Sequence, residues 1–384
     1  MKRHIRLIFL ASFFFSFHLA LLAYVNSSML GVFASPSLVG IIYTISAALS
    51  LILVSISPII IRRIGNVKYT GISLIITAIL LFIISSSSGT SIIPFFILYF
   101  ALNSVVLYSL DLFLEHYSAD KTTGNIRGKY LALGSIGWVL APISTTILQT
   151  SESFSAIYMS AAFIAIITFI VIVMGQRGFV DKIYKKGHLI DGINSLRKNK
   201  VLRNITFLNL MLQTYFVVMV IYSPVYLTTV IGFSWKTLGI ILSVMLLPFV
   251  LLPSPTGKLA DKYGEKRLMY LALFIMATAT IIFIYIGAVS AAVYAIVLFA
   301  TRIGASTLQT VCDSAFFKRV TDADSAVIST YRDMMPVAYT IGPLIAGLIL
   351  ALYSYKVLFI GISVAMAISM LAVYRIKNGH NHTT

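Results

Sequence analysis

The sequence predicts an all-α integral membrane protein whose twelve membrane-spanning helices form two parallel six-helix repeats. Hydrophobic residues make up 59% of the 384 residues and charged residues only 11%, whereas a soluble domain carries about 25% charged residues. Apolar runs of spanning length recur along the whole chain, and basic residues gather in alternate loops between them. The chain therefore has too few charges to cover a water-facing surface, and it has enough apolar segments to fill a bilayer.

Each predicted span is close to the roughly 20 apolar residues that a helix needs to cross a membrane. The first run follows a basic start, as a signal peptide does, but it is too long for the apolar region of one. We therefore expect it to be kept as the first helix. The twelve predicted spans are residues 6–28, 36–60, 68–87, 92–115, 128–150, 154–174, 204–228, 237–256, 268–288, 291–314, 327–351 and 356–375.

The loop charges predict the orientation. Nearly all of the 29 Lys and Arg residues fall in alternate loops, whereas the opposite loops hold only Lys236 and Lys356. Basic loops stay in the cytoplasm, so both termini are expected there, with the chain in the plasma membrane. The formal charge of +17 then follows from topology, and no nucleic-acid partner is expected.

A charged turn repeats once, half a chain apart. Residues Gly257–Arg267 read Gly-Lys-Leu-Ala-Asp-Lys-Tyr-Gly-Glu-Lys-Arg, and a degraded copy occupies Pro58–Lys68. Gly65 then lies opposite Gly264, and Arg62 opposite Asp261. Other pairs recur at nearly the same spacing, namely Gly40 with Gly239, Ala141-Pro142 with Gly342-Pro343, and Asp111 with Asp313.

Helices that run the same way in both halves indicate parallel repeats related by an axis along the membrane normal. The predicted divisions are an N-terminal bundle at 1–174, a cytoplasmic linker at 175–203, a C-terminal bundle at 204–376 and a tail at 377–384. The linker is spaced for a short surface helix and is too small for a catalytic domain.

With these motifs the chain resembles the major facilitator superfamily (MFS) of transporters over essentially its whole length. Gly257, Asp261, Gly264 and Arg267 match the family's loop signature, and Arg127-Gly128 with Ala141-Pro142 resemble its fifth-helix pattern. The resemblance implies that one six-helix half rocks against the other around a site near the midplane. It also implies a cytoplasmic latch at the hinge aspartate, which the first copy replaces with Arg62.

Two polar stripes mark the predicted translocation path. Residues spaced i, i+4, i+7 and i+11 share one helical face, and the resemblance implies that the fourth and tenth helices line the central cavity. Asp111 and Asp313 either clasp cytoplasmic loops or handle protons or substrate. Arg302 either pairs with a carboxylate or binds an anionic group of the substrate. The stripes are Ser104, Tyr108, Asp111 and Glu115 in the fourth helix, and Arg302, Ser306, Gln309 and Asp313 in the tenth.

Five further polar residues are candidates. His18 lies in the first span, where an ordinary pKa near 6.5 suits proton coupling, although packing explains such a histidine equally well. Asn209 and Gln213 share a face of the seventh helix and serve either the substrate path or helix contacts. Arg332 and Asp333 open the predicted eleventh helix, where a cytoplasmic-side salt bridge is favoured over substrate contact.

The function predicted is secondary active transport of a small solute by alternating access, with protons favoured over another coupling ion and efflux favoured over uptake. No phosphate-binding loop, nucleophile–base set or metal-ligand spacing is visible, and the single Cys312 excludes an intramolecular disulfide. We therefore expect no enzyme activity and no cofactor, and partners limited to the solute, membrane lipids and the coupling ion, in a monomer. The alternatives are a non-transporting sensor or scaffold, and a membrane-embedded enzyme for lipid-linked substrates, which would need a carboxylate or histidine cluster at one membrane face.

Overall fold

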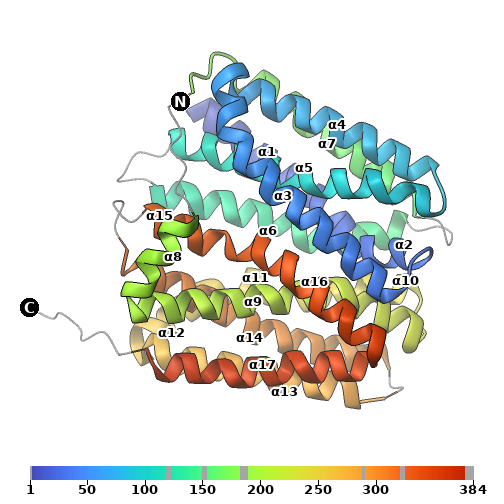
Figure 1. The fold of residues 1–384 in the computed structure, drawn as a ribbon, viewed down its shortest axis with the longest axis vertical. Helices are drawn as coiled ribbons and strands as arrows, with labels where there is room; N and C mark the ends of the chain where they lie inside the picture. The colour runs from blue at the N-terminus through green and yellow to red at the C-terminus, as the bar shows by residue number, and fades with distance from the viewer. Residues whose placement is uncertain are drawn as a thin grey trace, which may run out of the picture. The chain divides into compact units, whose positions relative to one another are not determined.

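The computed structural model describes residues 2–117, 123–148, 154–181, 189–287, 290–320 and 325–376. All regular elements in these ranges are helical (Figure 1). Ten described segments are long and apolar enough to cross a membrane, or eleven when one bent pair is counted as a single span. The fifth predicted span has a shorter apolar helix, Leu133–Leu148. The twelve predicted spans thus all have helical counterparts, and the all-α membrane fold is confirmed.

The first six spans contain seven α-helices and one 3-10 turn. The second span begins where Ser35 accepts a hydrogen bond from the Leu38 amide, a typical N-cap. It ends at Gly65, whose φ of 84° favours glycine. The elements are α1 (Lys2–Ala23), α2 (Asn26–Gly31), α3 (Pro36–Ile64), α4 (Asn66–Ser86), a 3-10 turn (Thr90–Ile92), α5 (Ile93–Tyr117), α6 (Thr123–Leu148) and α7 (Ser155–Gly175).

The later part of the chain contains the predicted linker helix and six further spans. The eighth span is broken at prolines, and its last piece is bent by 47° from the piece before it. The elements are α8 (Leu189–Lys198), α9 (Lys200–Val225) with a π-helical turn (Tyr226–Val230), α10 (Trp235–Leu246), α11 (Pro248–Leu251), α12 (Pro253–Tyr263), α13 (Glu265–Tyr285), α14 (Ala291–Phe317), α15 (Ser325–Arg332), α16 (Met334–Leu352) and α17 (Tyr355–Tyr374).

The backbone groups into two compact units. Unit 1 comprises Met1–Lys185 and Val220–Ser243, and unit 2 comprises Lys186–Met219 and Val244–Thr384. This grouping places the end of α9 and most of α10 with the N-terminal helices. The predicted bundle and linker boundaries remain predictions, and part of the linker and all of the tail at 377–384 lie outside the described residues.

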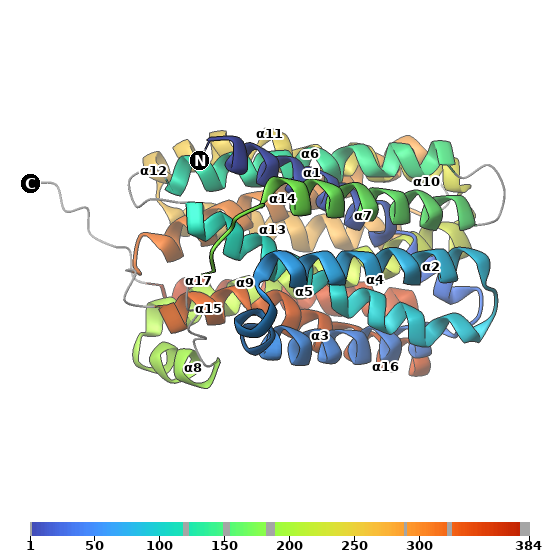
Figure 2. The same cartoon turned by 90° about the horizontal axis from the view of Figure 1, so that it is seen from above.

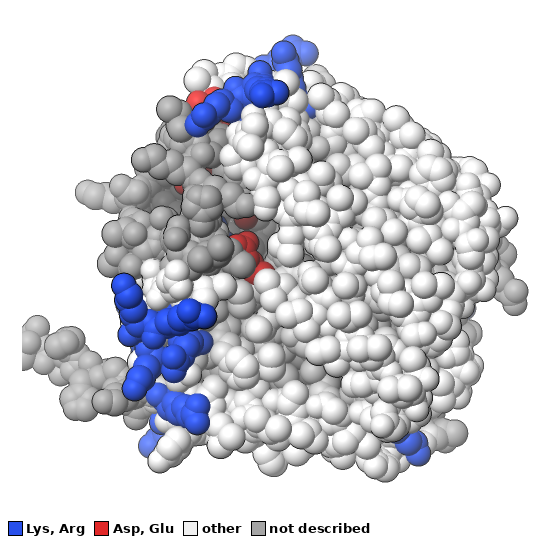
Figure 3. Space-filling model, viewed as in Figure 1, with Lys and Arg blue, Asp and Glu red and all other residues white. Residues whose placement is uncertain are grey.

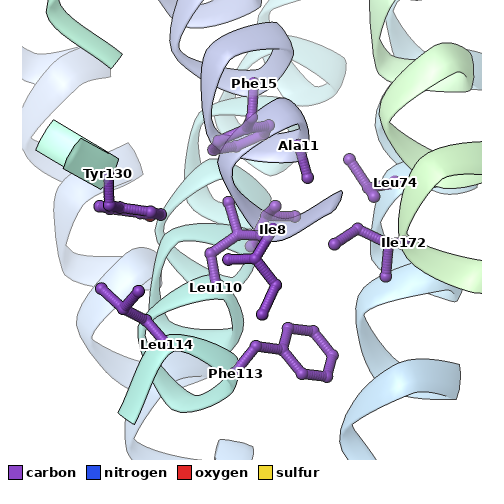
Figure 4. Close-up of a cluster of buried hydrophobic side chains, with 10 residues drawn as sticks. Ile8, Ala11, Phe15, Leu74, Leu110, Phe113, Leu114, Tyr130 and Ile172 are labelled. Carbon is purple, nitrogen blue, oxygen red and sulfur yellow. The ribbon is translucent and has the colours of Figure 1, made fainter. Parts of the chain in front are cut away.

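In unit 1, α1 packs against α6 and α7, and α5 packs against α3 and α4. Figure 4 shows buried side chains of α1, α4, α5, α6 and α7 meeting in one apolar cluster, with Ile8 and Leu110 near its centre. The contact between α1 and α6 depends on glycine, because a Cβ at Gly137 would lie 2.9 Å from the Phe17 amide nitrogen. Small residues of this kind let membrane helices approach closely.

The repeat predicted from the sequence is visible in the packing. The third span contacts the fourth and the sixth in the first half, as α4 with α5 and α4 with α7. The equivalent spans make the same contacts in the second half, as α13 with α14 and α13 with α17. The second and fourth spans also touch in both halves. Corresponding spans therefore have corresponding neighbours, as parallel repeats require.

Unit 2 places the linker helix at one of its ends. Helix α8 lies beside α15 (Figure 2). In the space-filling view, basic side chains gather at the edge where α8 lies in Figure 1, and uncharged atoms cover most of the rest of that face (Figure 3). Many large apolar side chains of the described spans are exposed, as contact with lipid tails requires.

Candidate functional site

The polar stripe on α14 runs from the interior of unit 2 toward the end of the helix. The side chains of Arg302 and Ser306 are each 1% exposed, while Gln309 and Asp313 are half-buried. The Ser306 hydroxyl donates a hydrogen bond of 3.1 Å to the carbonyl of Pro248, at the break in the eighth span. The stripe therefore joins α14 to a discontinuous helix, a kind of element that forms substrate sites in many transporters.

Arg302 faces an aromatic surface. Its guanidinium carbon lies 5.8 Å from the centre of the Phe216 ring of α9, and that ring contacts Phe249 of α11 edge-on at 5.6 Å. None of the three guanidinium nitrogens has a hydrogen-bond partner among the described residues. The predicted pairing with a carboxylate is therefore not seen in this part of the chain.

Asp313 is held by a tyrosine rather than by a hinge cation. The Tyr331 hydroxyl donates a hydrogen bond of 2.7 Å to the Asp313 carboxylate, and the Tyr331 ring stacks on Phe316 at 3.9 Å. The ion pairs found among the described residues do not include Asp313. The carboxylate thus stays inside the predicted tenth span with a neutral donor.

Asn209 and Gln213 extend this network into α9. The Gln213 amide donates to the Asn209 side-chain oxygen at 3.1 Å, and the Asn209 amide donates to the backbone carbonyl of Tyr331 at 2.9 Å. The two predicted residues are thus brought together with each other and with Asp313 through Tyr331. A change in the protonation of Asp313 can therefore affect the packing of α9 through these hydrogen bonds.

The matched stripe on α5 is partly covered by unit 1, where Tyr108 packs against a small buried cluster that includes Tyr69. Ser104 and Tyr108 are half-buried, while Asp111 and Glu115 are exposed. The opposite side of α5 contributes Leu110 to the apolar core of unit 1. The stripe on α5 is thus exposed at Asp111 and Glu115, whereas the stripe on α14 has no exposed member.

His18 is fully buried within unit 1. Its Nδ1 lies 2.9 Å from the carbonyl oxygen of Ala161 in α7, and its ring stacks on Phe15 at 5.6 Å and meets Tyr99 edge-on. This bond links α1 to α7 and fits the packing role. Its other ring nitrogen, Nε2, has no partner among the described residues.

The hinge of unit 2 is closed by ion pairs at its surface. Lys318, just after α14, lies 3.0 Å from Asp261 and 3.3 Å from Glu265, and Arg319 lies 2.9 Å from Glu265. The hydrogen bond to Asp261 raises the pKa of the Lys318 ammonium above its usual value. Gly264 has a φ of 89°, which permits the sharp turn between α12 and α13.

Gly257 and Arg267, the remaining residues of the hinge motif of unit 2, are not packed against other parts of the described chain. A Cβ added at Gly257 would meet nothing within 4 Å, and Arg267 is exposed. The side chain of Arg127, from the fifth-helix pattern, is not among those that the structure describes.

At the hinge of unit 1, the carboxylate comes from Asp181, which is distant in the sequence. Arg62 replaces the aspartate in that copy, but the Asp181 carboxylate accepts a hydrogen bond of 2.9 Å from the Asn66 amide. That amide is the first of α4, where the helix dipole favours a negative charge. Sequence reasoning missed Asp181, because it lies 115 residues away and no local pattern connects the two.

Replacing Asp181 by Ala is expected to destabilise unit 1 by about 0.5–2 kcal/mol, as loss of a helix N-cap does. Thermal unfolding of the purified protein measures the effect. Asp261→Ala is the matched control at the exposed hinge of unit 2, where an exposed ion pair contributes about 0–1 kcal/mol. A larger loss for Asp261→Ala than for Asp181→Ala would contradict this assignment.

Arg332 and Asp333 lie at a helix start inside the eleventh span, because Asp333 is the N-cap residue of α16. Arg332 ends the short helix α15, and Asp333 lies at the junction before α16. The eleventh span runs from Val327 to Leu352, close to the predicted 327–351, and it includes both helices with a break between them. The reason is that Pro336, which lacks a backbone N–H, sits in the first turn of α16 and favours a new helix start there.

Among the described residues, no group of three or more His, Cys, Asp and Glu side chains could hold a metal ion. Cys312 is buried in α14.

Comparison with known proteins identifies the class. The sequence profile of the Major Facilitator Superfamily matches residues 8–332 and 237–384. The chain is similar in fold to the nucleoside transporter NupG, with 14% identity and a TM-score of 0.75, covering 98% of this chain and 99% of that one. It is also similar to a bacterial homologue of the human lysosomal transporter Spinster in an inward-facing, unoccupied conformation, with 12% identity and a TM-score of 0.72, covering 98% and 94%. Among curated proteins, no sequence matches this chain.

The helical fold and its apolar spans define a polytopic membrane protein. The chain belongs to the major facilitator superfamily. It is thus a secondary transporter that works by alternating access on a small molecule, and it is not an enzyme.

Proposed function

We propose that this chain exports a small solute across the plasma membrane in exchange for protons. The observation that carries the proposal is Asp313, a carboxylate inside a membrane span that hydrogen-bonds to a neutral tyrosine. Ionisable groups are costly within a bilayer and mark proton relays or substrate paths. Among the described residues no cation lies within ion-pairing distance of Asp313, and Arg332 acts on the carboxylate from farther away, so protonation of Asp313 breaks no ion pair there.

The network around Asp313 supplies a way for protonation to alter helix packing. The Tyr331 hydroxyl, on α15, donates a hydrogen bond to the Asp313 carboxylate. The backbone carbonyl of Tyr331 accepts a hydrogen bond from the Asn209 side-chain amide of α9. Protonation of Asp313 weakens a charge-assisted bond, because such bonds are roughly twice as strong as neutral ones. The contact between α14 and α15 is therefore sensitive to the proton, which is what coupling to a conformational change requires.

Asp111 and His18 are the other proposed proton-handling groups. Asp111 is exposed on α5, one turn before Glu115. His18 is buried and bonded to α7, so its protonation would place a charge in the core of unit 1. The exposure of Asp111 favours it as the group that exchanges protons directly with water.

Efflux is favoured by the hinge motif of α12, which resembles the signature common in exporters. The excess of basic residues in alternate loops supports cytoplasmic termini by the positive-inside rule. The solutes named for the structural relatives are not carried over to this chain, because identities of 12% and 14% relate only the folds. They belong in the first panel of test solutes, beside organic anions and cations.

The test uses purified protein reconstituted in liposomes with a pH-sensitive dye inside. A transported solute is expected to move protons across the membrane in the opposite direction, and an imposed pH gradient is expected to drive its accumulation. Solute flux in the same direction as protons would overturn exchange and indicate symport. A chain that binds solutes but moves none of them under any gradient would support the sensor alternative instead.

A further inference from the structure

Arg302 is a charged side chain that the fold buries without a partner. It is 1% exposed, and its Nε, Nη1 and Nη2 atoms make no hydrogen bond within the described residues. A guanidinium is always charged and carries five N–H donors. Leaving such a group buried and unpaired is strongly unfavourable, so its retention calls for an anion that is not part of the described chain.

The neighbouring groups do not supply that anion. The Phe216 ring lies near the guanidinium carbon, at 5.8 Å, and its π face attracts a cation without replacing five hydrogen bonds. The Tyr215 hydroxyl is hydrogen-bonded to Thr280 at 2.8 Å. The Ser306 hydroxyl, one turn along α14, donates to Pro248. These hydroxyls are neutral, and none of them accepts a hydrogen bond from the guanidinium among the described residues.

Three acids of unit 2 also have partners away from Arg302. Asp313 lies eleven residues after Arg302 along α14, which is about 16 Å at the rise of an α-helix. Its carboxylate accepts a hydrogen bond from the Tyr331 hydroxyl. At the hinge, Asp261 pairs with Lys318, and Glu265 pairs with Lys318 and Arg319. None of the ion pairs among the described residues includes Arg302.

The surroundings of Arg302 have the features of a binding site for an organic molecule. Phe216 and Phe249 form an aromatic corner between α9 and α11, and α11 belongs to the broken eighth span. Apolar surface with a few convergent polar groups is typical of small-molecule sites. A single guanidinium balances one negative charge and matches the two oxygens of a carboxylate or sulfonate.

We propose that Arg302 binds the anionic group of the solute, and that this solute is an organic monoanion with a carboxylate or sulfonate on an aromatic or apolar body. Phe216 and Phe249 pack against that body. This assignment rests on the transporter proposed above and adds its substrate class. The structure shows the site closed around the guanidinium, and alternating access provides the opening through which the solute enters.

The test measures binding to purified full-length protein by isothermal titration and by thermal unfolding. The probes are benzoate and benzenesulfonate, with benzamide and benzyl alcohol as neutral matches. The anions are expected to bind and stabilise the wild type, and Arg302→Met is expected to weaken their binding about 100-fold. Arg302→Lys keeps the positive charge and is expected to keep the preference for anions over the neutral probes.

The stability of the free protein separates a binding role from a structural one. Arg302→Met removes an unpaired buried charge, so its midpoint of thermal unfolding without ligand is expected to rise above that of the wild type. A fall in that midpoint, or equal binding of benzoate and benzamide by the wild type, would overturn the proposal. Arg203→Met, in the first turn of the same helix as Phe216, is the control and should change neither measurement.

The outcome also separates this proposal from the proposed function. Proton-linked flux of neutral or cationic solutes, with no binding of either anion, would refute the substrate class and leave proton exchange standing. Anion binding that depends on Arg302, without flux of any solute, would support the site and refute transport.

Discussion

Asp313→Asn is expected to lower proton-driven transport by about 100-fold or more, the range that loss of a proton-transferring group causes. Asparagine has nearly the shape of aspartate and can still accept the hydrogen bond from Tyr331, but it cannot take up a proton. The protein is therefore expected to fold and to bind solute as before. The measurement is accumulation of solute in liposomes under an imposed pH gradient, compared with solute exchange without a gradient.

Two further variants locate this effect at the carboxylate. Tyr331→Phe removes the 2.7 Å hydrogen bond and keeps the carboxylate, so it is expected to slow transport while leaving it proton-driven. Asp261→Asn changes an exposed hinge carboxylate and is expected to change the rate without changing the ratio of gradient-driven to gradient-free flux. Should that ratio be unchanged in Asp313→Asn, and also in the double variant with Asp111→Asn, both carboxylates would be excluded from proton coupling.

Gly304→Leu is expected to prevent unit 2 from folding. A Cβ at this position would lie 2.7 Å from the Ala272 carbonyl oxygen and 2.7 Å from Cγ of Met276 in α13. Overpacking commonly costs about 1–3 kcal/mol, and here backbone blocks even the first carbon of the side chain. Gly304→Ala is expected to fold with a lowered midpoint of thermal unfolding, because it adds one carbon rather than four.

Gly361→Leu is the matched control, since it makes the same change in a membrane helix where a Cβ would meet nothing within 4 Å. Folded yield in detergent by size-exclusion chromatography and the unfolding midpoint compare the two variants. Equal yield and stability for Gly304→Leu and Gly361→Leu would show that α13 and α14 do not approach as closely as the structure has them.

The spans and the repeat could be predicted because their causes are local. A membrane helix satisfies its own backbone hydrogen bonds, so a run of apolar residues of sufficient length is enough to predict it. The hinge at Gly264 was equally readable, because its glycine and charges stand together in sequence. The break before α16 was not predicted, since the apolar pattern continues across Asp333 and does not reveal a second helix start.

The candidate residues could be found as polar positions within apolar spans, but their partners could not. Arg302 and Asp313 lie on one face of one helix, and that spacing alone allows either residue to pair with a distant opposite charge. The structure instead places Phe216 beside the arginine and Tyr331 beside the aspartate. Their proposed roles differ for this reason, anion binding for Arg302 and proton exchange for Asp313.

The sequence by itself determined the membrane class, the spans, the repeat and the resemblance to the superfamily, because hydropathy, loop charge and turn glycines act over a few residues. Only the tertiary structure decided which polar groups have hydrogen-bond partners. Asp181 reaches the first amide of α4 across 115 residues, while Arg302 is left without a hydrogen bond among the described residues. Such pairings depend on how helices far apart in the chain pack together, and no local pattern encodes them.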